Sequence, residues 1–131
     1  MRKPISAQVR KQGFTLIELL VVLAIVATLL LLVSPRYLNQ LEASREATLR
    51  DNLRTIRLVI DGFYGDHGRY PESLEELVEM RYLRSLPVDP ITESSETWLI
   101  VETQDELEGV VYDVRSGAPG RSRAGNAYAE W

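Results

Sequence analysis

The strongest constraint on this chain is a run of apolar residues close to its amino terminus. Three residues interrupt the run between Phe14 and Val33, and these are Thr15, Glu18 and Thr28. A helix of this length extends about 30 Å, which matches the hydrocarbon thickness of a bilayer. The run therefore predicts a helix inserted in a membrane, and a chain of 131 residues leaves room for one small domain after it.

Charge is distributed unevenly on the two sides of this run. Residues 1–13 hold four basic residues and no acid, whereas the rest of the chain holds 11 basic and 19 acidic residues. A basic segment before an apolar span stays on the cytoplasmic side, so we expect the carboxyl-terminal part to face outward, into the periplasm of a Gram-negative bacterium. Its acidic character argues against nucleic acid as a partner, because phosphate contacts need clustered Lys and Arg.

Residues that could form a metal or catalytic site are sparse. The chain contains no cysteine, so disulfides cannot stabilise a small exported domain, and oligomerisation or a metal are the alternatives. The single histidine, His67, has no companions for a metal site and is expected to be exposed in a turn. No serine has the histidine of a catalytic triad nearby. Four acids are expected on a solvated helix face: Glu72, Glu75, Glu76 and Glu79.

Beyond Pro35 the apolar residues recur at the spacing of one helix face. They are Leu38, Leu41, Leu49, Leu53, Ile56, Ile60 and Phe63. Because no glycine lies between Gly13 and Gly62, the pattern predicts one long helix over about 14–64. Pro35 removes a backbone donor and should kink this helix.

Glycines and prolines predict the organisation of the rest of the chain. Gly65, Gly68 and Pro71 are expected to end the long helix. The SLEE sequence at 73–76 has the pattern of a capping box and predicts a short helix over 74–82. Two strands are then expected at 98–101 and 110–114, paired as an antiparallel hairpin around a turn at 103–109. A final loop is expected at 116–131.

The junction between the basic segment and the apolar run has a specific sequence. The basic segment ends in Gly13, the residues FTLIE follow at 14–18, and the long apolar helix continues into an amphipathic one. This arrangement closely resembles the prepilin signature of type IV pilins and of the pseudopilins of type II secretion. Later segments are similar to the G-type, or major, pseudopilin: GRYP at 68–71, SLEEL at 73–77, LPVDP at 86–90 and YDVRSG at 112–117.

The resemblance implies the pilin fold, which is an α+β architecture. In that fold a long N-terminal helix, membrane-spanning in its first half and amphipathic in its second, packs on a short helix and a small antiparallel β-sheet. We accordingly expect a prepilin leader at 1–13 and a hydrophobic transmembrane and assembly helix at 14–34. A periplasmic globular domain, which includes the amphipathic half of the helix, is expected at 35–131.

The resemblance also implies a processing step and an assembly contact. A prepilin peptidase cuts between Gly13 and Phe14 on the cytoplasmic side and N-methylates Phe14, so the leader is lost and the apolar helix is kept. Glu18 pairs with the amino terminus of Phe14 on a neighbouring subunit. A lone carboxylate in lipid is unfavourable, and one that is paired with an ammonium is much less so. Pro35 matches the position at which helices in such filaments loosen.

One segment departs from the G-type pattern. That family has an aspartate-rich loop near the carboxyl terminus that binds calcium, a cation that prefers oxygen ligands. The equivalent residues here, 117–131, contain no aspartate and a single acid, Glu130. They also contain Arg121 and Arg123, which would repel a cation.

We therefore expect no metal site and no other cofactor. Asp113 and backbone carbonyls remain possible calcium ligands. Without a cation the loop has to be held by packing, and Tyr128 and Trp131 are its expected anchors.

These features predict a structural subunit of a type II secretion pseudopilus, and not an enzyme. The subunit polymerises through its N-terminal helix and helps to drive protein export across the outer membrane. Expected partners are a prepilin peptidase, copies of the same chain in a helical filament, minor pseudopilins, the inner-membrane assembly platform and the lipid bilayer. The expected location is the bacterial inner membrane, with a single pass and a periplasmic carboxyl-terminal domain.

Three alternatives stay open. The chain could be a pilin or minor pilin of a type IV pilus or of a DNA-uptake filament. It could also be a membrane-anchored binding module that never polymerises, and such an anchor would tolerate alanine at Glu18. An ordinary secretory signal peptide is disfavoured, because the sequence after the apolar run offers only poor small-residue cleavage sites.

Overall fold

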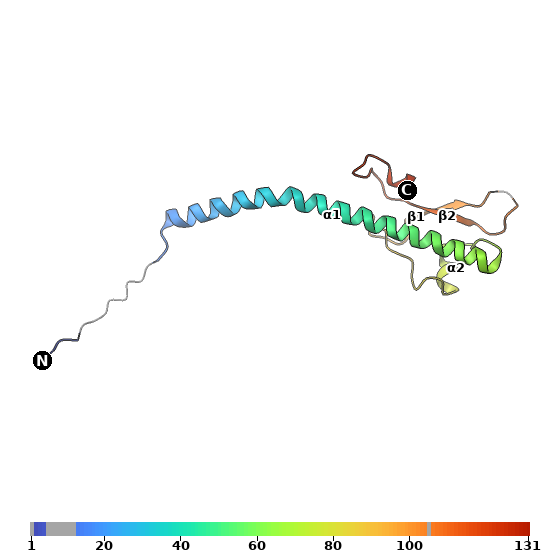
Figure 1. The fold of residues 1–131 in the computed structure, drawn as a ribbon, viewed down its shortest axis with the longest axis horizontal. Coiled ribbons are helices and arrows are strands. Elements are labelled where there is room, and N and C mark those ends of the chain that lie inside the picture. Colours follow the sequence, from blue (N-terminus) through green and yellow to red (C-terminus); the bar gives the residue numbers. More distant parts are fainter. Residues whose placement is uncertain (1, 5–12, 105) are drawn as a thin grey trace. The chain divides into compact units, whose positions relative to one another are not determined.

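The computed structural model describes residues 2–4, 13–104 and 106–131 (Figure 1). These residues form, in chain order, a long helix α1, a short helix α2, the strands β1 and β2, and a 3-10 turn η1. The chain divides into two compact units, Met1–Leu38 and Asn39–Trp131. The predicted α+β architecture is confirmed, and a long apolar helix with a short helix and a two-stranded antiparallel sheet is consistent with the pilin fold.

Helix α1 comprises Leu16–His67. It begins after Thr15, whose side-chain oxygen accepts a hydrogen bond from the backbone N–H of Glu18 at 3.2 Å, as an N-cap residue does. It ends before Gly68, which has the positive φ, 68°, that is common just beyond a helix. The predicted range of 14–64 is therefore slightly early at both ends, because these two residues set the boundaries.

Three residues that the sequence associates with a break lie inside α1. Gly65 was expected to help end the helix and His67 to lie in a turn, and both expectations are wrong. The His67 ring stacks on Phe63 with 4.2 Å between ring centroids, and its Nδ1 lies 3.2 Å from the Phe63 carbonyl oxygen. This contact supports the last turn of the helix. Pro35 also lies within α1, and the kink there stays a prediction.

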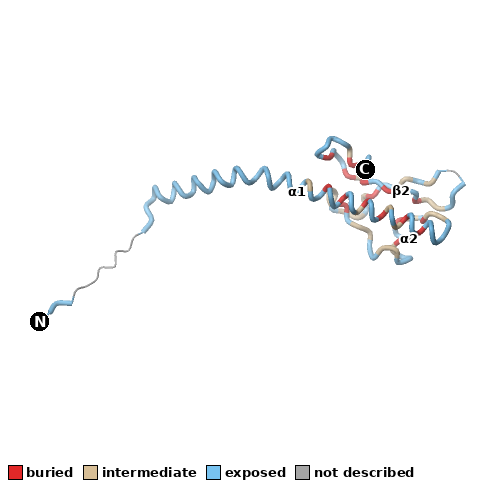
Figure 2. Tube along the Cα trace, in the orientation of Figure 1, coloured by how far each residue is buried: buried red, intermediate tan, exposed pale blue. Residues whose placement is uncertain are grey.

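The first unit contains the apolar part of α1. The large apolar side chains between Phe14 and Val33 are each at least 45% exposed, and Figure 2 shows this part of the helix as exposed along its length. By length and composition α1 is able to cross a membrane. A helix that is apolar on all sides and covered by no protein requires an apolar solvent, so these residues fit a single-pass membrane protein.

The core of the second unit is built on one face of α1 (Figure 2). The buried apolar residues on this face are Leu49, Leu53, Ile56, Ile60 and Phe63. They form one cluster with buried residues of the later elements, which include Leu74, Leu77, Trp98, Val111, Val114 and Tyr128. Leu38 and Leu41 were predicted to belong to the same face but are 57% and 37% exposed, because the first buried residue of α1 is Glu46.

Helix α2, Leu74–Glu79, is held by a capping box. The Ser73 hydroxyl oxygen accepts a hydrogen bond from the backbone N–H of Glu76 at 3.2 Å. In return the Glu76 carboxylate accepts from the backbone N–H of Glu72 at 2.7 Å, one residue earlier than in the usual box. The same carboxylate also pairs with the guanidinium of Arg69 at 2.6 Å. The capping box predicted from the sequence is therefore confirmed.

The predicted helix over 74–82 is too long at its carboxyl end. Arg81 has a positive φ of 62°, which a continuing helix does not allow. The chain folds back at this point, and the backbone N–H of Tyr82 donates to the carbonyl of Leu77 at 2.9 Å.

The two strands pair as an antiparallel hairpin, as the sequence predicts (Figure 1). Strand β1 is Trp98–Glu102 and strand β2 is Val111–Ser116, so the predicted ends are off by one or two residues. Ile100 lies opposite Val114 in the register, and an irregularity follows Val101. Along β2, Val111, Val114 and Ser116 are buried and the residues between them are more exposed, so the strand covers the core with part of its surface.

The hairpin turn is docked against the segment between the two helices. The backbone N–H of Tyr70 donates to Glu108 at 2.9 Å, and the N–H of Val110 donates to Pro71 at 3.0 Å. Gly109 has a φ of 96°, and a Cβ built at this position would lie 2.0 Å from the Tyr70 carbonyl oxygen. Only glycine fits this close backbone approach.

The carboxyl-terminal residues are more ordered than the predicted loop. They contain an isolated bridge between Arg121 and Ala127 and the 3-10 turn η1, Tyr128–Glu130. Tyr128 belongs to the buried core, and Trp131 packs against that core with its ring centroid 5.3 Å from that of Tyr128. The two expected anchors of this segment are therefore confirmed.

Candidate assembly site and carboxyl-terminal clamp

The predicted processing site lies immediately before α1. Gly13 and Phe14 are not helical, and the Phe14 side chain is 86% exposed. Residues 1 and 5–12, which make up most of the predicted leader, lie outside the described part of the chain. An extended, exposed peptide bond at this position is sterically open to a peptidase.

Glu18 lies in the first turn of α1 and is exposed. Its backbone N–H is used by the Thr15 cap, while its carboxylate forms no hydrogen bond or ion pair with the residues that the structure describes. An acid in the first turn is favourably placed in the field of the helix dipole. Sequence reasoning missed the role of Thr15, although the spacing of Thr15 and Glu18 is that of a capping box and could have indicated it.

Glu46 is the one buried charged residue of α1, with 9% of its surface exposed. Its Oε1 atom accepts a hydrogen bond from the backbone N–H of Arg123 at 2.7 Å and another from the hydroxyl of Tyr128 at 3.2 Å. Burial first, and then the hydrogen bond to Glu46, raise the pKa of the Tyr128 hydroxyl, so it remains a donor. Glu46 precedes Leu49 by three residues, and this spacing could have placed it on the buried face.

Arg57, about three turns further along α1, binds the other end of the same segment. Its Nη2 atom donates to the carbonyl oxygens of Trp131 at 2.7 Å and Val114 at 3.0 Å. Its Nε atom donates to the carboxylate of Asp113 at 2.8 Å. The guanidinium of Arg50 lies over the Trp131 ring, 4.5 Å from its centroid. We call Glu46, Arg50 and Arg57, with the residues of 117–131 that they bind, the carboxyl-terminal clamp.

Asp89 organises the loop before β1 and was also missed by sequence reasoning. It is fully buried, and its Oδ1 atom accepts from the backbone N–H of Ile91 at 2.8 Å. Its Oδ2 atom accepts from the hydroxyl of Ser116 at 2.5 Å. An aspartate followed by proline often bonds the backbone two residues on, and this turn chemistry was the available signal.

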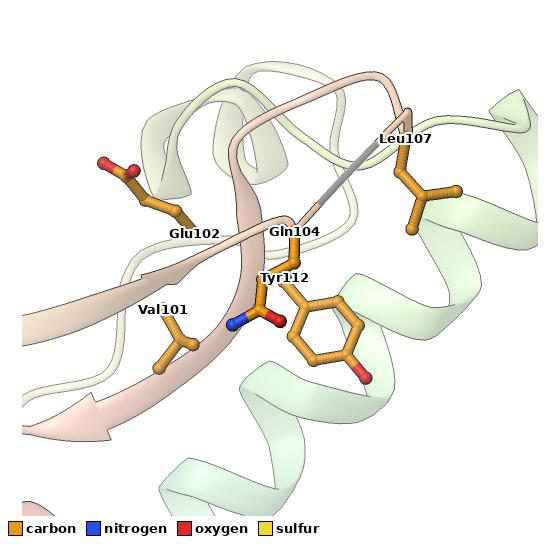
Figure 3. Close-up of a pocket in the computed structure, with 5 residues that line it drawn as sticks. All are labelled: Val101, Glu102, Gln104, Leu107 and Tyr112. Carbon is orange, nitrogen blue, oxygen red and sulfur yellow. The ribbon is translucent and has the colours of Figure 1, made fainter.

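A shallow pocket of about 310 Å³ lies beside the hairpin (Figure 3). Its lining residues are Val101, Glu102, Gln104, Leu107 and Tyr112. This set combines a carboxylate, an amide and a phenol without a histidine, lysine or serine. Among these five described residues, none is a nucleophile paired with a base.

The other candidate groups do not form a metal or catalytic cluster in the described residues. His67 lies near the Tyr82 hydroxyl, which donates to Asp66 at 2.5 Å. Of the four acids around α2, Glu76 is occupied by Arg69, and Glu75 and Glu79 are exposed. Within residues 2–4, 13–104 and 106–131, no group of three or more acidic or histidine side chains is arranged to hold a metal ion.

A family model described as the prokaryotic N-terminal methylation motif matches residues 9–34. The chain is 30% identical to type II secretion system core protein G of Pseudomonas aeruginosa, with 62% of this chain and 68% of that protein covered. It is 31% identical to type II secretion system core protein G of Klebsiella pneumoniae, with 62% and 69% covered.

A third relative shares a smaller part of its length with the chain. Identity to the type IV major pilin protein PilA of Myxococcus xanthus is 29%, with 52% of this chain and 31% of that protein covered. No solved structure matches the chain significantly.

The two core proteins G are matched over more than two thirds of their length, and the methylation motif coincides with the junction and the apolar helix. The long apolar helix, the short helix and the antiparallel hairpin are the elements expected of such a protein. The chain therefore belongs to the type II secretion core protein G family, the G-type pseudopilins among the type IV pilin-like proteins.

Proposed function

We propose that this chain is a structural subunit of a type II secretion pseudopilus, which polymerises through its N-terminal helix and helps to drive protein export across the outer membrane. The observation that carries this proposal is the methylation motif at residues 9–34, in a chain that matches core protein G over more than two thirds of that protein. Proteins of this family are structural subunits and not enzymes.

In this proposal a prepilin peptidase cuts between Gly13 and Phe14, and Phe14 becomes the N-methylated amino terminus. The exposed, non-helical conformation of both residues supports access by the enzyme. The cut leaves the whole of Leu16–His67 in the mature chain. The apolar helix then serves both as the membrane span and as the assembly element.

Assembly requires a partner for Glu18. A carboxylate costs roughly 2.5–3.5 kcal/mol at the centre of a membrane helix on insertion scales. The Thr15 cap occupies the backbone N–H of Glu18 and leaves the carboxylate without a partner in its own described residues. The amino terminus of Phe14 on a neighbouring subunit offsets part of that cost, because each charge replaces water that the other has lost. This pairing also sets the step between subunits.

The charges of the sequence support the proposed location. The basic leader stays in the cytoplasm by the positive-inside rule, so the second unit lies in the periplasm. From there the partners are copies of the same chain, minor pseudopilins and the inner-membrane assembly platform. We propose the domain division of 1–13, 14–34 and 35–131 on the same grounds, with Pro35 as the position where α1 loosens in the filament.

The alternative function is that of a pilin in a type IV pilus or in a DNA-uptake filament. The similarity to PilA gives this alternative only partial support, because the match covers 31% of PilA. Compared with the PilA match, the matches to core protein G extend over more of this chain and over more of the relatives. Their identities of 30% and 31% also exceed the 29% identity to the competence protein ComGC of Halalkalibacterium halodurans, although that match covers 63% of this chain and 78% of that protein. The secretion pseudopilus is therefore the function that we propose.

The proposal is tested on protein taken from membranes of the native host, by measuring the intact mass and fragmenting the amino terminus. We expect a chain that starts at Phe14 and carries one additional methyl group. A chain that still starts at Met1 in cells with an active prepilin peptidase would contradict the pathway, and so would a start beyond residue 28. Deletion of the gene should then abolish secretion but leave twitching and DNA uptake unchanged, and the reverse would favour the alternative.

A further inference from the structure

The carboxyl-terminal segment of this chain is attached to α1 by charged side chains rather than by a continuous sheet. Its isolated bridge between Arg121 and Ala127 is internal to the segment. Attachment to the rest of the domain therefore depends on packing of Ala118, Tyr128 and Trp131 and on the carboxyl-terminal clamp. The segment lies beyond the last strand, so it would separate from the domain if these contacts were lost.

Glu46 holds the middle of the segment. Its Oε1 atom takes one backbone donor, from Arg123, and one side-chain donor, from Tyr128. A buried carboxylate is costly unless it is hydrogen-bonded, and a buried donor left without its acceptor is costly as well. Because separation would leave both the Glu46 carboxylate and its donors without partners, this contact favours one position of the segment.

Arg57 holds the end of the segment. Its guanidinium donates to the Trp131 carbonyl, to the Val114 carbonyl and to Asp113, so a single side chain joins the last residue to strand β2. Arg50 adds a cation–π contact with the Trp131 ring. Helix α1 thus supplies both the acceptor, Glu46, and the donor, Arg57, and these two residues lie about three helical turns apart.

A divalent cation does not fit this region. Calcium needs six to eight oxygen ligands, roughly, and carboxylates supply most of its charge neutralisation. One oxygen of each nearby carboxylate is already bonded: Oδ1 of Asp113 accepts from Arg57, and Oε1 of Glu46 accepts from two donors. The shallow pocket of about 300 Å³ beside Glu46 is rich in guanidinium groups. Its lining residues are Glu42, Arg45, Glu46, Ile91, Arg121, Ser122, Arg123 and Tyr128. The buried hydroxyl of Ser122 has no hydrogen-bond partner among the described residues, but it is a single neutral oxygen beside three arginines.

We propose that the carboxyl-terminal clamp does the work of a metal site: Glu46 as acceptor and Arg57 as donor fix residues 117–131, and the domain holds this segment without a divalent cation. The proposal concerns the folded monomer and does not depend on filament assembly. A failure of assembly and a failure of the clamp are therefore measured separately.

The first test is thermal unfolding of the full chain in detergent micelles, with excess calcium or with a chelator. We expect the same Tm in both conditions. A cation bound at a hundredfold excess over its Kd would raise Tm by roughly 10 °C or more in a domain of this size. An increase of that kind on adding calcium would overturn the proposal.

The second test is the rate of trypsin cleavage after Arg121 and Arg123, measured in the chelator on the folded chain. Glu46→Ala should accelerate cleavage about tenfold, because it leaves two donors without an acceptor and favours local opening. Glu46→Gln keeps a side-chain oxygen as acceptor and should restore most of the protection. Asp51→Ala is the matched control, since Asp51 is an exposed acid on the same helix that does not line the pocket beside Glu46, and it should leave the rate unchanged.

Tyr128→Phe keeps the ring and removes one donor, so it tests the clamp even if Glu46→Ala prevents folding. We expect a smaller acceleration of cleavage than for Glu46→Ala. Arg57→Lys should have a similarly small effect, because the compact ammonium group of lysine cannot reproduce the planar fork of donors with which the guanidinium reaches its three acceptors. Unchanged cleavage rates in Glu46→Ala, Tyr128→Phe and Arg57→Lys would overturn the proposal. So would a calcium-dependent rate that Glu46→Gln abolishes, since that result would make Glu46 a metal ligand.

Discussion

The two halves of α1 differ in their surroundings more than in their helical structure. Between Phe14 and Val33 the apolar side chains are exposed on every side, whereas beyond Glu46 one apolar stripe is buried and most other residues are polar (Figure 2). The first half requires an apolar solvent, and the second half requires an apolar partner face in the same domain. One helix therefore satisfies two environments, and the same substitution has different consequences in each half.

The same difference applies to the acids of the helix. Glu18 in the first half has no partner among the described residues, and Glu46 in the second half accepts two hydrogen bonds. The carboxylate in the apolar half thus needs a partner from another molecule, while the carboxylate in the second half is hydrogen-bonded within its own domain.

Replacing Glu18 should have the largest effect. We expect Glu18→Ala to be inserted and processed normally but to fail to form filaments, because the pairing that lowers the cost of burial is lost. The measurement is filament recovery by shearing, together with the mass of the processed chain. Thr28→Ala is the matched control in the same half, since the Thr28 hydroxyl donates to the Ala24 carbonyl of its own helix at 2.8 Å. Normal filaments from Glu18→Ala would contradict the pairing.

A leucine from each half gives the second prediction. Leu53→Ala should reduce the unfolding free energy of the domain by about 2–5 kcal/mol, because it opens a cavity in a core position that is 2% exposed. Leu29→Ala removes the same atoms from a side chain that is 56% exposed and should leave the unfolding of the domain unchanged. Thermal unfolding of the full chain in micelles measures both. Equal losses of stability would show that the two halves are not independent.

The third prediction concerns a cap outside α1. Ser73→Ala should reduce the unfolding free energy by about 1 kcal/mol, because the backbone N–H of Glu76 loses its acceptor. Hydrogen exchange of the α2 amides reports the loss at the site itself. Thr15→Ala, the corresponding cap of α1, should leave domain unfolding unchanged, and a loss of the same size there would contradict the independence of the halves.

The smallest expected effect is a dependence on pH. The hydrogen bond from Arg69 lowers the pKa of Glu76 below its ordinary 4.5, and the backbone N–H of Glu72 contributes as well. The contribution of Glu76 to stability is therefore present above about pH 4.5 and is lost as the pH falls through the lowered pKa of the folded state. Unfolding should be followed between neutral pH and pH 3 for the wild type and for Glu76→Gln. The acid-dependent loss should be smaller in the variant, and identical pH profiles would contradict the assignment.

Much of the fold was predictable because its signals are local. The apolar run, the helix stripe at Leu49 to Phe63 and the capping box at 73–76 each depend on residues a few positions apart. Errors arose where a side-chain contact or the position of the core overrode the preference of a single residue. Gly65 and His67 are helical because the His67 ring stacks on Phe63, and Leu38 and Leu41 are exposed because the core begins at Glu46.

The sequence by itself determined the membrane-spanning length of the apolar run, the prepilin motif around Gly13 and Phe14, and the position of an unpaired acid at Glu18. These depend on composition and spacing along one segment. Only the tertiary structure decided what holds the carboxyl-terminal residues. Glu46 bonds to residues 77 and 82 positions away, and Arg57 bonds to a residue 74 positions away. Partners at that separation meet only after the core has formed, so no local pattern specifies them.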